Sequence, residues 1–501
     1  MTARVYSIAL LGLNGQIVEV EVDIRRGKNK VNIIGLPDKA VSEAKDRILP
    51  AIKNSNCIFP KGIITVNLAP ADIPKFGSVY DLPIAVGILI ASNQLQLESS
   101  DKIFVGEVSL EGSLRDTNGI LSILDSGKDI GFKEFYVPSD NYEEASLVQG
   151  VVVYPVKNIN ELLMHFSGKI IHRPTIKINK ASRKEDSKYN LKYIKGQYHA
   201  KRALEIAAAG GHNCLFNGVP GSGKTFLARC LPGILPDMTF DESIEVTRIY
   251  SVAGLLPKNK PLVSERPFRT PHHTLSQVAL VGGGSFPKPG EVTLAHRGVL
   301  FLDEFSEFNT KSLEVLRQPL EDKIVTISRA SGTITFPANF MLVAAMNPCK
   351  CGFKGDPDRE CTCAPTELLK YQRKISGPVM DRIDLQVKVP KVKLDKLISQ
   401  KDEEGNEVVR KRVQNARSIQ LERFKHEPDI YNNSDMNQQM IKKYIKLNKA
   451  SLELLKTAID SLNLTARSYF RILKVARTIA DLTESETVQK DHVAEALSYR
   501  M

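Results

Sequence analysis

The chain has 501 residues. A single compact core does not accommodate that length, so two to four domains are expected. Its most apolar internal stretch, residues 82–91, is much shorter than the roughly 20 residues that cross a bilayer, which argues against a membrane protein. The net charge of +12 favours polyanionic partners through long-range attraction.

The first residues predict a folded domain rather than a targeting segment. Residues 1–13 lack a small-residue cleavage site, and residues 17–22 alternate in the manner of a strand. We therefore expect a cytoplasmic protein with no membrane attachment. In that compartment, reduced or metal-bound cysteines are commoner than disulfides.

Residues 1–168 have the pattern of an α/β domain. Strand-like runs lie at 63–66 and 103–105, and helical patterns cover 38–54 and 82–93. Residues 169–190 are polar and rich in lysine and arginine, which predicts a basic linker.

Residues 191–392 alternate short apolar strands with helices, the pattern of a parallel sheet with crossover helices. Residues 393–501 are helical almost throughout, with segments at 403–424, 450–462 and 466–481. The expected fold class is therefore α/β, followed by an all-helical C-terminal domain.

A phosphate-binding loop is the strongest motif. GVPGSGKT, residues 218–225, follows an apolar strand and precedes a helical segment, which is the context that the G-x-x-x-x-G-K-[ST] motif requires. Its backbone amides and the helix N-terminus attract phosphate; Lys224 would neutralise the β- and γ-phosphates, and the Thr225 hydroxyl would bind Mg²⁺. The residues expected to hold ATP are Gly218, Val219, Pro220, Gly221, Ser222, Gly223, Lys224 and Thr225.

Two carboxylates end the apolar strand at 299–302. A strand buried on both faces places Asp303 and Glu304 at the carboxyl edge of a sheet, where α/β folds bind ligands. Asp303 would hold the Mg²⁺ shell and Glu304 would orient the attacking water, which predicts ATP hydrolysis. Asn347 ends a third apolar strand, 340–346, and could contact the γ-phosphate or that water.

Four cysteines follow Asn347 in two C-x-C pairs: Cys349, Cys351, Cys361 and Cys363. Four thiolates can form a closed tetrahedral Zn²⁺ site, although C-x-C is tighter than the common C-x-x-C spacing. A structural zinc site and four reduced cysteines remain as alternatives.

Several segments occur in the order seen in one family. They are IIGLPDKAVSEAKDRI, NLAPADIPKFGSVYDLPIAVGIL, GQYHAKRALEIAAAGGHN, AHRGVLFLDEF, MNPCKCG and ISGPVMDRIDL. Across essentially the whole chain, the sequence resembles the ComM/YifB family of magnesium-chelatase-like AAA+ ATPases. The resemblance implies a Lon-protease-like domain at 1–168, an AAA+ core at 191–392 and a helical lid at 393–501. It also makes residues 218–225 Walker A, Asp303 and Glu304 Walker B, and Asn347 sensor 1.

The resemblance also assigns arginines. It makes Arg382 the arginine finger that reaches the ATP of a neighbouring subunit, with Arg373 as the second choice. Arg467 matches the sensor-2 arginine of the lid, and Arg471, one turn away, is its structural competitor. A site completed by a neighbour implies a ring, and the family forms hexamers.

Two segments are expected to face the ring's central pore. Residues 323–338 alternate as a hairpin and resemble the pre-sensor-1 hairpin, while 272–298 resemble the helix-2 insertion. Lys288 and Arg329, at their tips, are either DNA contacts or solvated turn residues. His272 and His273 are left as pore or interface residues.

The Lon-like domain is expected to lack protease activity. A serine–lysine dyad is needed, and Ile84 and Ile123 fall near its two positions. Ser78 and Lys128 lie nearby in sequence and leave a displaced dyad as the alternative.

We therefore expect a homo-hexameric, ATP-hydrolysing motor that acts on single-stranded or branched DNA, as a helicase or branch-migration translocase in recombination or natural transformation. The alternative is a chelatase-type or MoxR-like ATPase that remodels a protein partner. The expected cofactors are ATP and Mg²⁺, with structural Zn²⁺ as the open possibility.

Overall fold

The computed structural model describes residues 2–175, 188–257, 260–284, 288–329, 332–374, 377–392, 403–428, 430–462 and 464–500. The chain forms two compact units. The first unit comprises Met1–Lys180 with Phe240–Val263, and the second comprises Ala181–Thr239 with Ser264–Met501. Residues 176–187 of the predicted linker lie outside the described part of the chain.

The first unit is built on a seven-stranded mixed sheet of order β3-β4-β2-β1-β5-β8-β9. β1 pairs antiparallel with β2 and parallel with β5, and β2 pairs antiparallel with β4. The strands are β1 (Thr2–Leu11), β2 (Asn14–Arg25), β3 (Lys30–Ile34), β4 (Ile63–Ala69), β5 (Lys102–Phe104), β8 (Glu134–Pro138) and β9 (Val152–Val156), with β6 (Glu107–Val108) and β7 (Leu114–Arg115) as a separate pair. The strands predicted at 17–22, 63–66 and 103–105 are thus present.

Helix α3 (Asp81–Ala91) forms the centre of this unit's core. Ten of its residues are buried, which its almost continuous apolar sequence explains, and it packs on β1 and β2. The single helix expected over 38–54 is present as two segments, α1 (Lys39–Ser42) and α2 (Ala44–Asn54), with Glu43 between them. The other helices are α4 (Ile120–Ile130), α5 (Tyr142–Ala145) and α6 (Ile159–Phe166).

One helix of the first unit comes from far along the chain. α9 (Phe240–Val252) follows the phosphate-loop segment in sequence but packs on α4. Ser251 Oγ accepts a hydrogen bond from the Gly119 amide at 2.9 Å and donates one to Glu144 at 2.5 Å. These buried polar contacts fasten α9 to the N-terminal fold.

The second unit contains a five-stranded parallel sheet of order β11-β14-β17-β10-β18. Its strands are β11 (Phe268–Arg269), β14 (Val299–Leu302), β17 (Met341–Met346), β10 (Cys214–Asn217) and β18 (Leu385–Lys388). β14 is buried along its full length, as its four consecutive apolar residues predict. In a parallel sheet the carboxyl ends of all strands meet at one edge, so β10, β14 and β17 bring their following residues together.

The hairpin predicted at 323–338 is present in the second unit, and a second, shorter strand pair lies within residues 272–298. β12 (Gly282–Gly283) pairs with β13 (Lys288–Pro289), and β15 (Ile324–Arg329) pairs with β16 (Gly332–Pro337). The short helices around them are α10 (Gln277–Val281), α11 (Glu291–Leu294), α12 (Thr310–Glu314) and α13 (Arg317–Asp322).

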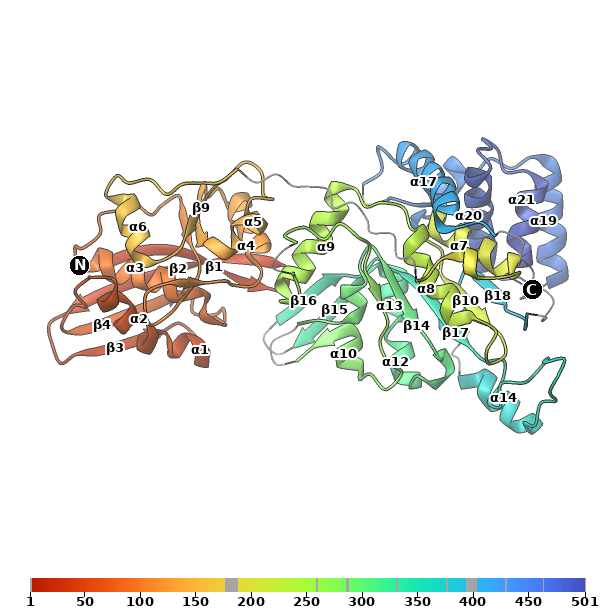
Figure 1. Ribbon diagram of the computed structural model, residues 1–501, viewed down its shortest axis with the longest axis horizontal. Coiled ribbons are helices and arrows are strands. Elements are labelled where there is room, and N and C mark those ends of the chain that lie inside the picture. Colours follow the sequence, from red (N-terminus) through yellow and green to blue (C-terminus); the bar gives the residue numbers. More distant parts are fainter. Residues whose placement is uncertain are drawn as a thin grey trace. The chain divides into compact units, whose positions relative to one another are not determined.

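Helices cover the sheet and form the C-terminal region. α17 (Asn406–Arg423), α20 (Ala466–Leu482) and α7 (Tyr198–Gly210) contact one another and share one hydrophobic core with the sheet. The remaining helices are α8 (Lys224–Ile234), α14 (Pro365–Lys374), α15 (Gly377–Met380), α18 (Gln438–Tyr444), α19 (Lys449–Leu462) and α21 (Lys490–Ser498). Helix α21 packs against both α19 and α20 (Figure 1).

The α/β class and the helical C-terminal region are confirmed. Within the ranges given above, no helix has the length and apolar character that a membrane span requires.

Candidate nucleotide site

The phosphate loop lies between β10 and α8, as predicted. Gly221 and Gly223 have φ values of +78° and +90°, a conformation that glycine adopts without strain, and α8 begins at the next residue, Lys224. The Gly218 amide donates to the Met346 carbonyl of β17 at 3.2 Å, which fixes the start of the loop against the neighbouring strand.

Lys224 is buried within this loop. Its ammonium donates to the carbonyls of Gly218 and Val219 at 2.7 and 2.9 Å, and to Asn347 Oδ1 at 3.3 Å. Burial lowers the pKa of Lys224 below its ordinary value, while the Asp303 carboxylate opposes that shift. A desolvated cation among carbonyl dipoles is well suited to bind a phosphate oxygen.

Thr225, in the first turn of α8, lies next to Asp303, which directly follows β14. Thr225 Oγ1 donates a hydrogen bond to Asp303 Oδ2 at 2.8 Å. A hydroxyl and a carboxylate side by side form the oxygen donor set that Mg²⁺ takes beside nucleotide phosphates, so these residues fit that ion.

Glu304 follows Asp303 in a left-handed conformation, with φ of +51°, which is uncommon for a residue other than glycine. Its amide donates to Asp303 Oδ1 at 2.9 Å, and this bond helps to hold the turn. The turn directs the Glu304 side chain away from the buried strand, and that side chain is 61% exposed. An exposed carboxylate at the sheet edge is placed to accept a proton from water.

His273 lies beside Glu304, a contact that the sequence did not reveal. His273 Nδ1 is 3.3 Å from Glu304 Oε2, and the His273 and His272 rings are tilted by 33° with their centroids 4.2 Å apart. A cavity of about 670 Å³ opens next to them, lined by residues 273–277 and 307–312. The two residues are 31 positions apart in the sequence, and no motif spacing predicts that they meet.

Asn347 lies at the end of β17, next to the phosphate loop, as its predicted role requires. Besides the contact with Lys224, its backbone carbonyl lies 2.8 Å from the Tyr371 hydroxyl, which is also 2.8 Å from Ser306 Oγ. Tyr371 of α14 therefore links the residue after β17 with the turn after β14. No sequence motif pointed to Tyr371.

Arg382 and Arg467 come together elsewhere. Both pair with one carboxylate, Glu321 of α13; the Arg467 distance is 3.8 Å. Burial lowers the pKa of Arg382, and the positive charges of Arg467, Arg317 and Arg471 act in the same direction. Positive charge is thus concentrated around Glu321.

This arginine cluster lies near the amino-terminal ends of the strands, whereas the phosphate loop of the same chain lies at their carboxyl-terminal ends. Asn213, which precedes β10, donates to the Arg382 carbonyl at 2.8 Å, whereas Gly218 follows β10. The four residues of β10 span about 13 Å between these two ends. The backbone of Arg382 is therefore one strand length from the loop that it is predicted to assist.

Arg471 has a different environment from Arg467. Its guanidinium lies 2.8 Å from Asp384 Oδ1, and the Asp384 carboxylate also accepts from the Asn213 amide at 3.1 Å. Burial acts to raise the pKa of Asp384, but Arg471 and His212 outweigh it and hold that pKa well below the usual range. These contacts give Arg471 a structural role.

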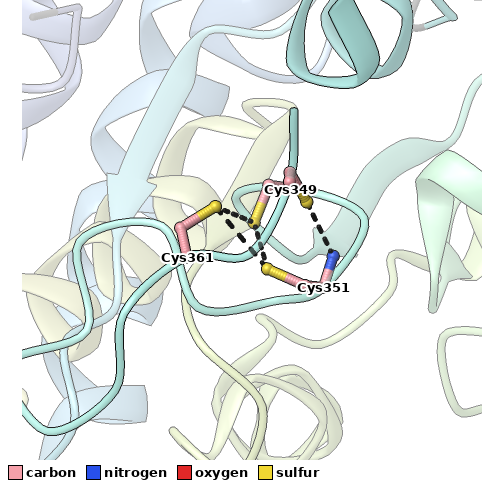
Figure 2. A group of neighbouring side chains, drawn as sticks. Cys349, Cys351 and Cys361 are labelled. Carbon is pink, nitrogen blue, oxygen red and sulfur yellow. Dashed lines mark hydrogen bonds between the residues drawn. The ribbon is translucent and has the colours of Figure 1, made fainter. Parts of the chain in front are cut away.

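The four predicted cysteines lie close together. Figure 2 labels three of them, Cys349, Cys351 and Cys361, whose sulfur atoms point toward one another. Cys349 Sγ lies 3.4 Å from Cys351 Sγ and 3.7 Å from Cys361 Sγ, and the latter two are 3.6 Å apart. Cys363 Sγ accepts from the Cys351 amide at 3.3 Å, and all four sulfur atoms lie within 4.8 Å of one another.

The comparisons with known proteins agree across the chain. Residues 190–397 match the family described as magnesium chelatase, subunit ChlI; residues 20–141 match subunit ChlI of Mg-chelatase; and residues 403–500 match the C-terminal part of that subunit. Competence protein ComM of Haemophilus influenzae is 44% identical over 507 residues, covering 99% of this chain and 97% of that protein. YifB of Escherichia coli, an uncharacterized protein, is 39% identical over 504 residues, covering 99% and 96%.

The chain belongs to the ComM/YifB family of magnesium-chelatase-like AAA+ proteins. Membership in the ComM/YifB family implies ATP and Mg²⁺ as the cofactors, which the Lys224, Thr225 and Asp303 geometry fits. A weaker similarity, 26% identity over 203 residues, relates 36% of the chain to Lon protease 2 of Bacillus subtilis.

Other predicted residues of this ComM/YifB protein have varied surroundings. Lys288 is exposed at the start of β13, Arg329 ends β15, and the side chains of Arg329 and Arg373 lie outside the described part. In the Lon-like unit, Ile84 and Ile123 are buried.

The displaced dyad considered for the Lon-like unit is not assembled. Ser78 donates to Glu107, while the Lys128 ammonium lies beside Gly150. Because these two side chains have different neighbours, they form no serine–lysine pair in the described structure.

Proposed function

We propose that this protein is a cytoplasmic ATPase that assembles as a homo-hexameric ring and acts on DNA as a helicase or branch-migration translocase. One observation supports the ring. Arg382 and Arg467 lie near the amino-terminal ends of the strands, whereas their own phosphate loop lies at the carboxyl-terminal ends. A second copy can present these arginines to that loop across an interface. Each ATP site then needs residues from two chains.

The residues of one chain divide the reaction among them. Lys224 binds the phosphates, Thr225 and Asp303 bind Mg²⁺, and Glu304 orients and deprotonates the attacking water. Asn347 contacts Lys224 and is placed to sense the γ-phosphate. Arg382 from the neighbouring copy neutralises charge that develops on the transferred phosphoryl group.

Three observations support DNA as the substrate. The chain carries a net charge of +12, and Lys288 is exposed on the β12–β13 hairpin. The similar protein from Haemophilus influenzae is named a competence protein, which points to natural transformation. A motor that grips phosphates binds without sequence preference and with strong salt dependence.

The test is the ATPase rate of the full chain at low salt, with and without single-stranded, duplex and branched DNA. DNA-stimulated hydrolysis and ATP-dependent strand displacement on a branched substrate are expected. The matched control is the Glu304→Gln variant, which should bind the same DNA without displacing strands. If DNA neither binds the protein nor stimulates its ATP hydrolysis, the motor is contradicted, and an ATPase that remodels a protein partner becomes the better proposal.

A further inference from the structure

The segment between Asn347 and α14 has little regular structure of its own. Residues 347–364 form turns, bends and irregular backbone, and most side chains from 354 to 362 are exposed and polar. Such a segment buries too little apolar surface to hold one conformation by packing. Cys349, which is fully buried, and Gly352 are its main internal anchors.

The four thiols of this segment have the geometry of a mononuclear metal site. Four sulfur atoms at about 2.3 Å from a tetrahedral Zn²⁺ lie about 3.8 Å from one another. The three separations among Cys349, Cys351 and Cys361 are 3.4, 3.6 and 3.7 Å. A disulfide would bring two sulfurs to about 2.0 Å, and a cluster of several irons would hold the four thiols farther apart.

Backbone amides support the same set of thiolates. The Cys351 amide donates to Cys363 Sγ and the Lys354 amide donates to Cys349 Sγ, each at 3.3 Å. Amide donors of this kind orient and stabilise metal-bound sulfur in outer-shell contacts. All four ligands are cysteine, which favours zinc over magnesium or calcium.

We propose that Cys349, Cys351, Cys361 and Cys363 bind one structural Zn²⁺, and that this ion holds the segment after Asn347 against the phosphate loop. The contact is direct: Gly352, with φ of +88°, packs so closely that a Cβ there would lie 2.7 Å from Pro220 Cγ. At its two ends the segment is fixed by the Asn347 contact with Lys224 and by Tyr371. The zinc site therefore sets the position of the γ-phosphate sensor, an inference that rests on the proposed ATPase function.

Metal content tests the site without reference to ATP. Full-length protein, purified without chelators or a metal-affinity column, is analysed by elemental mass spectrometry and by thiol titration before and after denaturation. One zinc per chain is expected. The Cys361→Ser/Cys363→Ser variant should lose this zinc, and the matched control, Cys57→Ser, should retain it. Exchange of zinc for Co²⁺ should give the visible absorption of a tetrahedral thiolate site.

Other results would overturn the metal assignment. The first is a purified protein that contains no zinc, takes up none from solution and has all four thiols free to titrate. The second is a protein that contains iron in place of zinc. If the double cysteine variant is unfolded by circular dichroism, the cobalt spectrum of the wild-type chain still decides the ligand set.

Nucleotide binding tests the second part of the proposal. The double cysteine variant and Gly352→Ala should each bind a fluorescent ATP analogue roughly tenfold more weakly, and only Gly352→Ala should keep its zinc. Zinc present in the wild type but without effect on nucleotide binding would contradict the positioning role. Failure of the ATPase proposal is recognised separately, because wild-type protein would then bind zinc but not ATP.

Discussion

His273 Nδ1 lies 3.3 Å from Glu304 Oε2, so a side chain from the segment before α10 holds the carboxylate proposed to activate water. Glu304 is 61% exposed and sits on a strained turn, and it therefore has few other contacts that fix its orientation. We expect His273 to act as a positioning residue, because it contacts the Glu304 carboxylate.

Replacing His273 tests this role. His273→Ala should lower kcat for ATP hydrolysis on the order of tenfold with little change in ATP affinity, since only the orientation of Glu304 is lost. His272→Ala is the matched control, because the His272 ring bonds to Thr274, 2.9 Å away. Equal losses in the two variants, or a loss confined to affinity, would count against the positioning role.

Glu304→Gln removes the base and keeps the size of the side chain. The variant should bind ATP normally and hydrolyse it about 10²- to 10³-fold more slowly, because the amide cannot accept the proton of the attacking water. Single-turnover hydrolysis and analogue binding measure the two properties separately. Glu314→Gln, at an exposed position of α12, serves as the surface control, and near-normal turnover in Glu304→Gln would refute the assignment.

The two arginines at the start and second turn of α20 should behave differently. Arg471→Ala leaves buried Asp384 without its guanidinium and should destabilise the fold by about 3 kcal/mol. Arg467→Ala, whose side chain is 62% exposed, should leave stability nearly unchanged and lower the ATPase rate. Thermal unfolding and ATPase assays on both variants check this; the opposite pattern would exchange the two roles.

The lowered pKa of Asp384 also predicts that the stability of the fold depends on pH. Its pKa is held below the usual range in the folded chain, so its stabilising contribution is complete above the unfolded pKa of about 3.9. The contribution is lost as pH falls below that value toward the folded pKa. Asp384→Asn should therefore unfold at a lower temperature than wild type at pH 7, and the difference should shrink below pH 4. A difference that is constant with pH would contradict the ion-pair explanation.

The local parts of the nucleotide site could be predicted from the sequence. The phosphate loop, Asp303, Glu304 and Asn347 each follow an apolar strand, and parallel pairing brings the ends of those strands to one edge. The spacing of the cysteines likewise placed four thiols in one short segment. In these cases short-range pattern and sheet topology suffice.

The contacts between distant segments could not be predicted in this way. Glu321 pairs with Arg382 and Arg467 across 61 and 146 residues, and His273 contacts Glu304 from the segment before α10, with several short elements between the two residues in sequence. The packing of α9 on α4 joins residues on either side of the phosphate loop in sequence. Such contacts depend on tertiary packing, which periodicity does not encode.

The central claim is that each ATP site uses residues from two chains, and mixing two inactive variants tests it most directly. Arg382→Ala chains keep the phosphate loop, whereas Lys224→Ala chains keep the arginine. Each variant alone should be nearly inactive, and an equimolar mixture assembled together should regain ATPase activity at about a quarter of its interfaces. A mixture as inactive as its components, or an Arg382→Ala protein with wild-type turnover, would contradict the account.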